Sequence, residues 1–169
     1  MPQVIKFLPL HQHHFLLIEQ WLALPHVARW WSEGIQWTYA RVKEKYTTYV
    51  DGYVQRNGKQ VLIQALIIEF NNVYIGYIQV YNVRDFSTQD DIPLPSATAG
   101  IDLYIGKSDF LGKKLSTPII KQFLEQVVWP NFAACTVDPA QENLVAIQAF
   151  ARVGFVPVKN SCLMVLHQS

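Results

Sequence analysis

The sequence contains little charge, and this scarcity excludes two classes of protein. Charged side chains make up 16% of the 169 residues and leave a formal net charge of +1, whereas typical globular chains are about 25% charged. A chain without an excess of basic residues is poorly suited to neutralising nucleic-acid phosphates. Disordered chains combine low hydrophobicity with high net charge, and 50% of the residues here are hydrophobic. We therefore expect a folded protein that does not bind nucleic acid.

Cysteines and long apolar runs are also scarce. Cys135 and Cys162 are the two cysteines, too few for a disulfide framework, and both lie in apolar runs that predict buried thiols. The longest apolar run, 61–68, is far shorter than the roughly 18 residues of a membrane span. Residues 1–6 lack the charged start of a signal peptide. These absences predict a cytoplasmic protein with no membrane association, in which residues 1–169 form a single domain.

Hydrophobic spacing predicts the elements of the first half of the chain. Apolar residues three and four positions apart indicate helices, and alternating or continuous apolar runs indicate strands. The expected elements are a strand at 3–8, helices at 11–24, 25–31 and after Thr38, and strands at 60–70 and 73–81. Thr38 is a suitable N-cap, and Pro25 is tolerated in the first turn of a helix. Asn71 and Asn72 tolerate positive φ, which predicts a hairpin between the two long strands.

The second half alternates strands with helices. The expected elements are a strand at 100–105, a helix after Gly112, a strand at 132–137, a helix at 142–153, and strands at 154–157 and 162–166. A strand–helix–strand–helix–strand run implies parallel pairing through right-handed crossovers. The hairpin of the first half is antiparallel. The sequence therefore predicts an α/β protein with a mixed sheet.

Five motifs along the chain resemble those of one enzyme superfamily. They are Trp21-Leu22-x-x-Pro25-His26-Val27-x-x-Trp30-Trp31, Val42-x-Glu44-x-Tyr46, Ile75-Gly76-Tyr77-x-Gln79-x-Tyr81, Gly100-Ile101-Asp102, and Asp138-Pro139 followed by Asn143-Leu144-x-Ala146-Ile147 and Gly154-Phe155. In this order they resemble the GNAT acyl-CoA N-acetyltransferases, and most of all the bacterial aminoglycoside 6′-N-acetyltransferases. The resemblance covers nearly the whole chain. It implies the GNAT fold: a mixed, mostly antiparallel central sheet with a parallel splayed region, flanked by helices.

The resemblance also implies acetyl-CoA as co-substrate. A CoA pyrophosphate needs backbone amides that approach it closely at a helix N-terminus. The family places the pattern Gln/Arg-x-x-Gly-x-Gly/Ala there, and this chain has Lys114 and Ser116 at the two later glycine positions but keeps Gly112. A plain loop before a core helix is the alternative. The implied CoA contacts are Leu103, Tyr104, Ile105, Leu111, Gly112, Lys113, Lys114, Leu115, Ser116, Asn143, Ile147 and Phe150.

Asp102 matches the catalytic aspartate of the family. An alkylammonium has a pKa near ~10, so its nucleophilic free base is scarce at pH 7 and a carboxylate base is the usual remedy. A surface or capping role for Asp102 is the alternative. Backbone N–H groups of residues 103–105 can polarise the thioester carbonyl. Phe150 stands where the family has a tyrosine general acid, a tolerable loss because a thiolate leaving group, with a pKa near ~8.5, hardly needs one.

The resemblance places aromatic and acidic side chains around the acceptor. The implied contacts are Trp31, Tyr46, Gln79, Tyr81 and Asp138, with Asp90 and Asp91 in a loop where the family carries a further acid. Solvated loop acids are the alternative for the last two. Acids in a concave site attract a polycation, and aromatic faces pack on sugar rings. Of Trp30 and Trp31, we expect one in the core and one at the ligand.

The expected reaction is acetylation of a primary amine on a small polar acceptor, by a monomer or homodimer. Aminoglycosides are the best named acceptor class, and antibiotic resistance is the role that this class implies. Two alternatives stay open. The first is a GNAT enzyme acting on another amine, such as a polyamine, a siderophore precursor or a peptide. The second is a non-catalytic acyl-CoA-binding relative, which the departures at Lys114, Ser116 and Phe150 would fit.

A cluster of histidines raises the question of a metal. His11, His13 and His14 lie within four residues. Structural metal sites need about four convergent ligands, and no cysteine or carboxylate is spaced to complete this set. We therefore expect no metal site and a solvated helix start.

Overall fold

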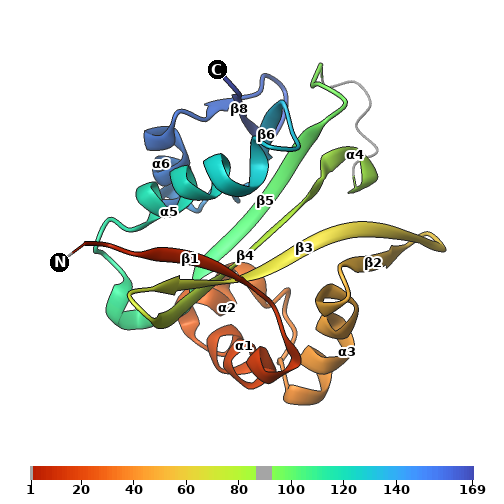
Figure 1. Cartoon of the computed structure of the whole chain (residues 1–169), viewed down its shortest axis with the longest axis vertical. Coiled ribbons are helices and arrows are strands. Elements are labelled where there is room, and N and C mark those ends of the chain that lie inside the picture. Colours follow the sequence, from red (N-terminus) through yellow and green to blue (C-terminus); the bar gives the residue numbers. More distant parts are fainter. Residues whose placement is uncertain (1, 87–92) are drawn as a thin grey trace. The chain divides into compact units, whose positions relative to one another are not determined.

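The computed structural model describes residues 2–86 and 93–169 (Figure 1). Two compact units can be distinguished. The first, here the N-terminal unit, comprises Met1–Gln79 and Leu103–Leu111; the second, the C-terminal unit, comprises Val80–Asp102 and Gly112–Ser169. Strands β4 (Val73–Asn82) and β5 (Thr98–Ile105) contribute residues to both units. The single-domain organisation stays a prediction.

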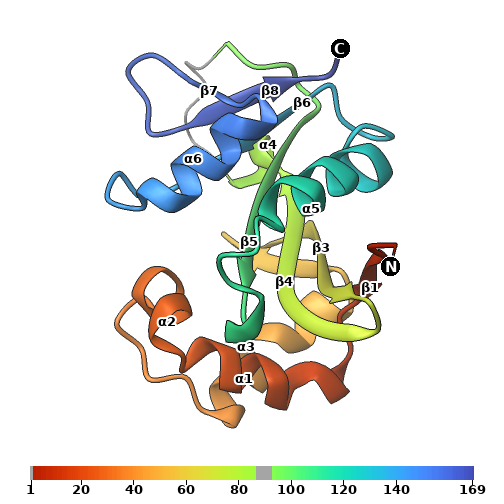
Figure 2. The same cartoon turned by 90° about the vertical axis from the view of Figure 1, so that its left-hand side faces the viewer.

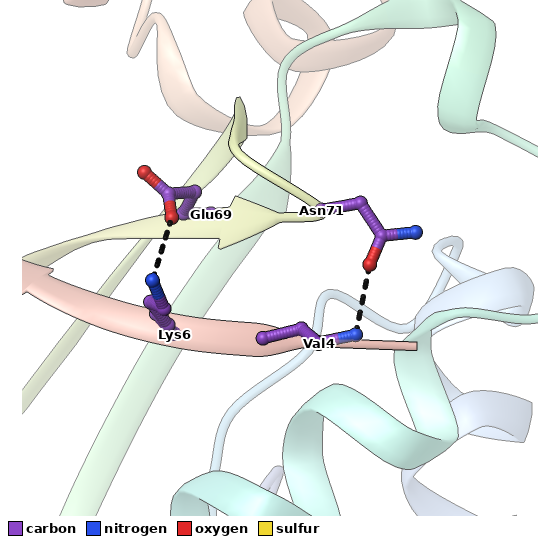
Figure 3. Close-up of polar contacts among 4 residues, drawn as sticks. All are labelled: Val4, Lys6, Glu69 and Asn71. Carbon is purple, nitrogen blue, oxygen red and sulfur yellow. Dashed lines mark hydrogen bonds and ion pairs between the residues drawn. The ribbon is translucent and has the colours of Figure 1, made fainter. Parts of the chain in front are cut away.

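The sheet of the N-terminal unit has the order β1-β3-β4-β5. Strand β1 (Ile5–Pro9) pairs antiparallel with β3 (Lys59–Phe70). Two polar contacts fix β1 to the end of β3 (Figure 3): the Lys6 ammonium lies 3.8 Å from the Glu69 carboxylate, and the backbone N–H of Val4 donates to Asn71 Oδ1 at 2.9 Å. Asn71 and Asn72 both have positive φ, at 47° and 67°. The predicted hairpin is confirmed.

One strand of this unit was not predicted. Strand β2 (Tyr53–Arg56) pairs antiparallel with the start of β3. The turn between them consists of Asn57 and Gly58, at φ 50° and 76°, the pattern of a tight hairpin turn with two positive φ angles. The Asn57-Gly58 pair is a turn signal, but the four residues before it lack the clear alternation that would identify a strand.

Three helices lie on one side of the strands of this unit (Figures 1 and 2): α1 (Phe15–Leu22), α2 (Pro25–Trp31) and α3 (Tyr39–Val50). Helix α2 has the predicted bounds: Pro25 begins it, and a bend at Ser32 follows its last residue. Thr38 caps α3, since its Oγ1 accepts from the backbone N–H of Arg41 at 3.3 Å. The helix expected at 11–24 instead begins with a 3-10 turn, η1 (Gln12–His14).

The sheet of the C-terminal unit has the order β4-β5-β6-β8-β7. Strand β6 (Ala134–Val137) is parallel to β5, as predicted. Strand β8 (Met164–His167) then lies between β6 and β7 (Val156–Pro157) and is antiparallel to both. Parallel pairing within the second half is thus confirmed for β5 with β6, whereas residues 156–157 do not pair with β6 directly. The direction of β7 is as expected, but the last strand of the chain separates it from β6.

Helices α5 (Ser116–Phe123) and α6 (Leu144–Val153) pack side by side in this unit (Figure 2). Helix α5 continues into a π-helical turn, η3 (Leu124–Val128), and a short helix, α4 (Val83–Phe86), follows β4. Asn143 caps α6, because its Oδ1 accepts from the backbone N–H of Ala146 at 3.2 Å. Gly154 ends α6 at φ 118°, a left-handed conformation that favours glycine.

The two cysteines differ in exposure. Cys135 is buried in β6, as predicted. Cys162 is exposed, so its predicted burial is wrong. It lies in the turn between β7 and β8, which the bond from the backbone N–H of Val158 to the Leu163 carbonyl closes at 2.9 Å. Within the described part of the chain, no helix has the length and hydropathy needed to cross a membrane.

Candidate functional site

Asp102 and Tyr81 form a hydrogen-bonded pair in the C-terminal unit. Both side chains are half-buried, and the Tyr81 hydroxyl donates to the Asp102 carboxylate. Burial raises the pKa of Tyr81 well above its usual value, and the negative charge of Asp102 and this hydrogen bond raise it further. The phenol therefore stays protonated and acts as the donor. Asp102 is held by a neighbouring strand and is not a loose surface carboxylate.

Gly100 makes room for this pair. A Cβ built on Gly100 would lie 2.5 Å from Cε2 of Tyr81 and 2.9 Å from its hydroxyl oxygen. The ring of Tyr81 therefore lies against the backbone of β5. Residues two apart on a strand point to the same face, so Gly100 and Asp102 share the face that Tyr81 covers. Phe86 packs on the Tyr81 ring, with centroids 4.5 Å apart.

Strand β6 provides further polar groups near this pair. Thr136, opposite Gly100 in the parallel ladder, donates its hydroxyl to the Ala99 carbonyl at 3.1 Å. Burial and then the charge of Asp102 raise the pKa of the Cys135 thiol, so it stays protonated and is a poor nucleophile. Asp138 follows β6 and is exposed, yet partial desolvation raises its pKa. Its charge also acts on Tyr81.

The N-terminal unit contains the aromatic residues expected at the acceptor. Tyr77 is fully buried, and three rings surround it with centroid distances of 5.6 to 5.9 Å: Trp31, Tyr46 and Tyr104. Tyr46 is 1% exposed, and burial raises the pKa of both Tyr46 and Tyr104. The Tyr104 hydroxyl is buried with no hydrogen-bond partner among the residues described. Trp31 packs against this core, whereas Trp30 carries the Arg29 guanidinium 4.6 Å above its ring.

Gln79 is oriented by Tyr77. The Tyr77 hydroxyl donates to Gln79 Oε1 at 2.7 Å. Tyr77 belongs to the motif at 75–81 but was not predicted as a site residue. Tyr77 and Gln79 are two residues apart on β4, so their side chains point to the same face of the strand. This spacing is the sequence signal that could have identified Tyr77.

Several contacts fix the end of β5 in the N-terminal unit. His26 Nε2 lies 3.0 Å from the Ile105 carbonyl oxygen. A Cβ on Gly76 would lie 2.3 Å from the Tyr104 carbonyl oxygen, so only glycine permits β4 to approach β5 this closely. The backbone N–H of Gly106 donates to the Ile75 carbonyl at 2.7 Å. The segment expected to polarise a thioester is thus held by residues that the sequence analysis did not assign.

The loop before α5 has an unusual backbone. Gly112 and Lys114 both have left-handed φ, at 71° and 57°. Lys114, where the family pattern has a glycine, thus adopts a conformation that favours glycine. Ser116 is the first residue of α5 and does not cap it; Leu115 holds the N-cap position, where no side chain caps the helix. The first backbone amides of α5 thus face no capping side chain, as an anion site requires.

The other predicted CoA contacts lie in and around α6. Asn143 uses its side chain to cap the helix, and Ile147 is half-buried. Phe150 is 8% exposed and packs on Phe155 with ring centroids 5.5 Å apart. Asp90 and Asp91 lie outside the described residues.

The histidine cluster differs from the expected solvated helix start. His14 is 3% exposed, and its Nδ1 accepts from the backbone N–H of His11 at 3.0 Å. Burial, then the neighbouring His13 and His11, lowers its pKa from 6.5 to about 4. His14 is therefore a neutral core residue. Among the residues described, no group of three or more metal-binding side chains is suitably placed to hold an ion.

Comparison with known proteins supports the sequence resemblance. The family described as "Acetyltransferase (GNAT) domain" matches residues 11–163. An aminoglycoside N(6′)-acetyltransferase type 1 of Klebsiella pneumoniae is 27% identical over 150 residues, which are 85% of this chain and 70% of that protein. The resemblance to an acetyltransferase enzyme predicted from the motifs is confirmed at the level of the family.

Solved structures support the fold. The structure of the aminoglycoside acetyltransferase AAC(6′)-Ib in complex with coenzyme A and kanamycin has a TM-score of 0.78 and 22% identity, covering 98% of this chain and 95% of that one. A spermidine N-acetyltransferase from Vibrio cholerae, in complex with CoA and spermine, has a TM-score of 0.71 and 15% identity, covering 97% and 95%. At these identities the likeness concerns the fold alone, and it confirms the predicted mixed α/β architecture.

Proposed function

Since the chain belongs to the GNAT acetyltransferase family, we propose that it transfers the acetyl group of acetyl-CoA to a primary amine of a small polar acceptor, in the manner of aminoglycoside 6′-N-acetyltransferases. The observation that carries this proposal is Asp102, a half-buried carboxylate on β5 at the position of the family's catalytic base. Strand β5, which bears Asp102, continues into residues 103–105. The family resemblance implies that the backbone of these residues lies beside the thioester.

The first task of the site is to deprotonate the acceptor. An alkylammonium with a pKa near 10 requires about 4–5 kcal/mol to reach its free base at pH 7. Asp102 takes this proton, directly or through water. The amine nitrogen then attacks the thioester carbonyl carbon, the carbon–sulfur bond breaks, the CoA thiolate leaves, and the new amide nitrogen releases its extra proton to solvent. Backbone N–H groups at 103–105 stabilise the developing oxyanion, and solvent protonates the thiolate, because Phe150 carries no hydroxyl.

The loop before α5 supports acetyl-CoA as the acetyl donor. The left-handed backbone at Gly112 and Lys114 and the uncapped start of α5 are features that suit a phosphate site. Lys113 and Lys114 are both exposed and add positive charge to it. Asn143, Ile147 and Phe150 at α6 are the further contacts that the family implies.

Two observations support a cationic acceptor. Asp102 and Asp138 both act electrostatically on Tyr81, so two carboxylates converge on one region and attract an ammonium group. The curated relative at 27% identity is named for aminoglycoside acetylation. The other acceptor contacts that the family implies are Trp31, Tyr46 and Gln79, with Asp90 and Asp91. A polyamine is the second candidate, favoured by the fold likeness to a spermidine N-acetyltransferase.

The same proposal places the reaction in the cytoplasm, where acetyl-CoA is available, and makes antibiotic resistance its consequence. The working form is a monomer or a homodimer.

A thiol-release assay tests the proposal. Acetyl-CoA is supplied with kanamycin, tobramycin, spermidine or a lysine derivative, and free CoA is measured over time. We expect release that depends on an aminoglycoside, with mass spectrometry showing a gain of one acetyl group. Release with spermidine alone would select the polyamine acceptor. Calorimetry with acetyl-CoA is the companion measurement. If no binding is detected at millimolar acetyl-CoA, the proposed acetyl transfer is contradicted.

A further inference from the structure

We propose that Tyr81 is a positioning residue for Asp102, holding the carboxylate ionised and in a fixed orientation through its hydroxyl. The family resemblance assigned Tyr81 to the acceptor. The geometry assigns it instead to the carboxylate: the Tyr81 hydroxyl lies against Gly100, two residues before Asp102 on the same face of β5, and donates to the Asp102 carboxylate. This inference rests on the proposed role of Asp102 as the base.

The contact between Tyr81 and Asp102 depends on the absence of a side chain at Gly100. At residue 100 any Cβ would fall within 2.9 Å of three atoms of the Tyr81 ring and hydroxyl. Glycine at this position therefore lets the phenol reach across β5 to the residue two positions further on. Phe86 packs on the Tyr81 ring, at a centroid distance of 4.5 Å, and limits its movement. Tyr81 is thus fixed by packing before it donates its hydrogen bond.

The groups around Asp102 explain why such a donor is needed. The Cys135 thiol on β6 lies close enough to the Asp102 carboxylate to interact with it electrostatically. This thiol is buried and neutral. Asp138, after β6, adds a second negative charge to the surroundings of Tyr81. A neutral apolar wall and a nearby like charge both favour protonation of a carboxylate. A donated hydrogen bond favours its ionised form, and the Tyr81 hydroxyl supplies one from β4.

Tyr81 is unsuited to the alternative role of general acid. A phenol whose pKa is raised far above 10 gives up its proton less readily than water-accessible groups at pH 7. It therefore does not replace the tyrosine that the family has where this chain has Phe150. Its contribution passes through Asp102.

Two substitutions separate this role from simple packing. Tyr81→Phe keeps the ring and removes the hydroxyl. Gly100→Ala keeps the hydroxyl and displaces the ring. If Tyr81 positions Asp102, both variants raise the midpoint of the acid limb of kcat/KM by about one pH unit and lower kcat about tenfold, and the double variant is no worse than either. KM for acetyl-CoA stays unchanged. Tyr53→Phe on β2 is the matched control and changes none of these values.

A second readout does not depend on turnover. The side-chain carboxyl carbon of Asp102, assigned by comparison with Asp102→Asn, is titrated by NMR in the wild type and in Tyr81→Phe. A rise in its midpoint by about one pH unit in the variant supports the inference. An unchanged midpoint overturns it, whether or not the enzyme turns over. If the midpoint shifts but the wild type acetylates no acceptor, the contact stands and the proposed function fails. A rise confined to the acceptor KM would return Tyr81 to the acceptor site.

Discussion

Lys114 repeats, two residues further along the chain, the left-handed backbone of Gly112: the two φ angles are 57° and 71°. An L-residue with a side chain resists this conformation, at a cost of about 1–2 kcal/mol. The lysine keeps the shape of the loop at the expense of stability. Strain of this kind is concentrated at functional sites, and here it lies in the segment proposed to hold the CoA phosphates.

Replacing Lys114 by glycine is therefore expected to stabilise the protein. The gain in the free energy of unfolding is about 0.5–1 kcal/mol, because relief of strain is partly offset by the greater freedom of glycine in the unfolded chain. Urea unfolding measures it. Lys114→Ala, which removes the charge but keeps Cβ, is the control and gains nothing. Equal stabilisation by both variants would mean that charge, and not backbone strain, is responsible.

Asp102→Asn tests the base directly. The amide cannot accept the proton of the acceptor, so kcat/KM falls by about 10²- to 10⁴-fold, while the Kd for acetyl-CoA measured by calorimetry is unchanged. Asp51→Asn, at the C-terminal end of α3, removes an equal charge elsewhere and serves as the control. Turnover at the wild-type rate in Asp102→Asn would remove this residue from the base role.

The buried imidazole of His14 makes stability depend on pH. Its pKa is about 4 in the folded protein and 6.5 ordinarily, so between these values the unfolded chain binds the proton and the folded chain does not. The free energy of unfolding therefore falls as the pH drops from about 6.5 to about 4, with no further loss from this group below that. His11, His13 and the edge-on ring of Tyr74 face this imidazole.

Urea titrations at pH 7 and pH 5 measure this effect in the wild type and in His14→Asn. Asparagine keeps an acceptor near the position of Nδ1 but does not titrate. The wild type should lose more stability between the two pH values than the variant does. Parallel losses would show that other groups govern the acid sensitivity.

Phe150→Tyr restores the hydroxyl that the family uses as a general acid. We expect kcat to change less than about threefold, because a thiolate leaving group, with a pKa near ~8.5, departs without strong acid assistance. Steady-state kinetics at pH 7 measure it, with unfolding by urea as a check that a hydroxyl beside Phe155 is tolerated. A tenfold rise in kcat would mean that protonation of the leaving group limits this enzyme.

Local signals predicted much of the fold. Pro25 and Thr38 determine where α2 and α3 begin, and Asn71-Asn72 determines the hairpin, because each acts through its own backbone or its nearest neighbours. The insertion of β8 between β6 and β7 was not predictable in this way. It depends on pairing between segments that are distant in the sequence. Turn and cap residues carry no information about such pairing.

In the candidate site too, local sequence predicted some features, whereas others depend on contacts between distant segments. Asp102 was predicted as the base from the Gly-Ile-Asp motif, but its bond to Tyr81 depends on two strands and on the absence of a side chain at Gly100. The strained φ of Lys114 was likewise unforeseen, since lysine rarely adopts it. The burial of His14 requires contacts from elements far along the chain. Residue identity indicated the chemistry, and long-range contacts determined its geometry.

The unequal exposure of the two thiols has a practical consequence for chemical labelling. Cys162 is open to solvent, whereas Cys135 is buried and its thiol stays protonated. A maleimide dye should therefore attach at a single position, between the last two strands and away from Asp102 in the sequence. The same asymmetry matters for colorimetric detection of CoA with a disulfide reagent: each chain contributes one background thiol, and a Cys162→Ser variant removes it.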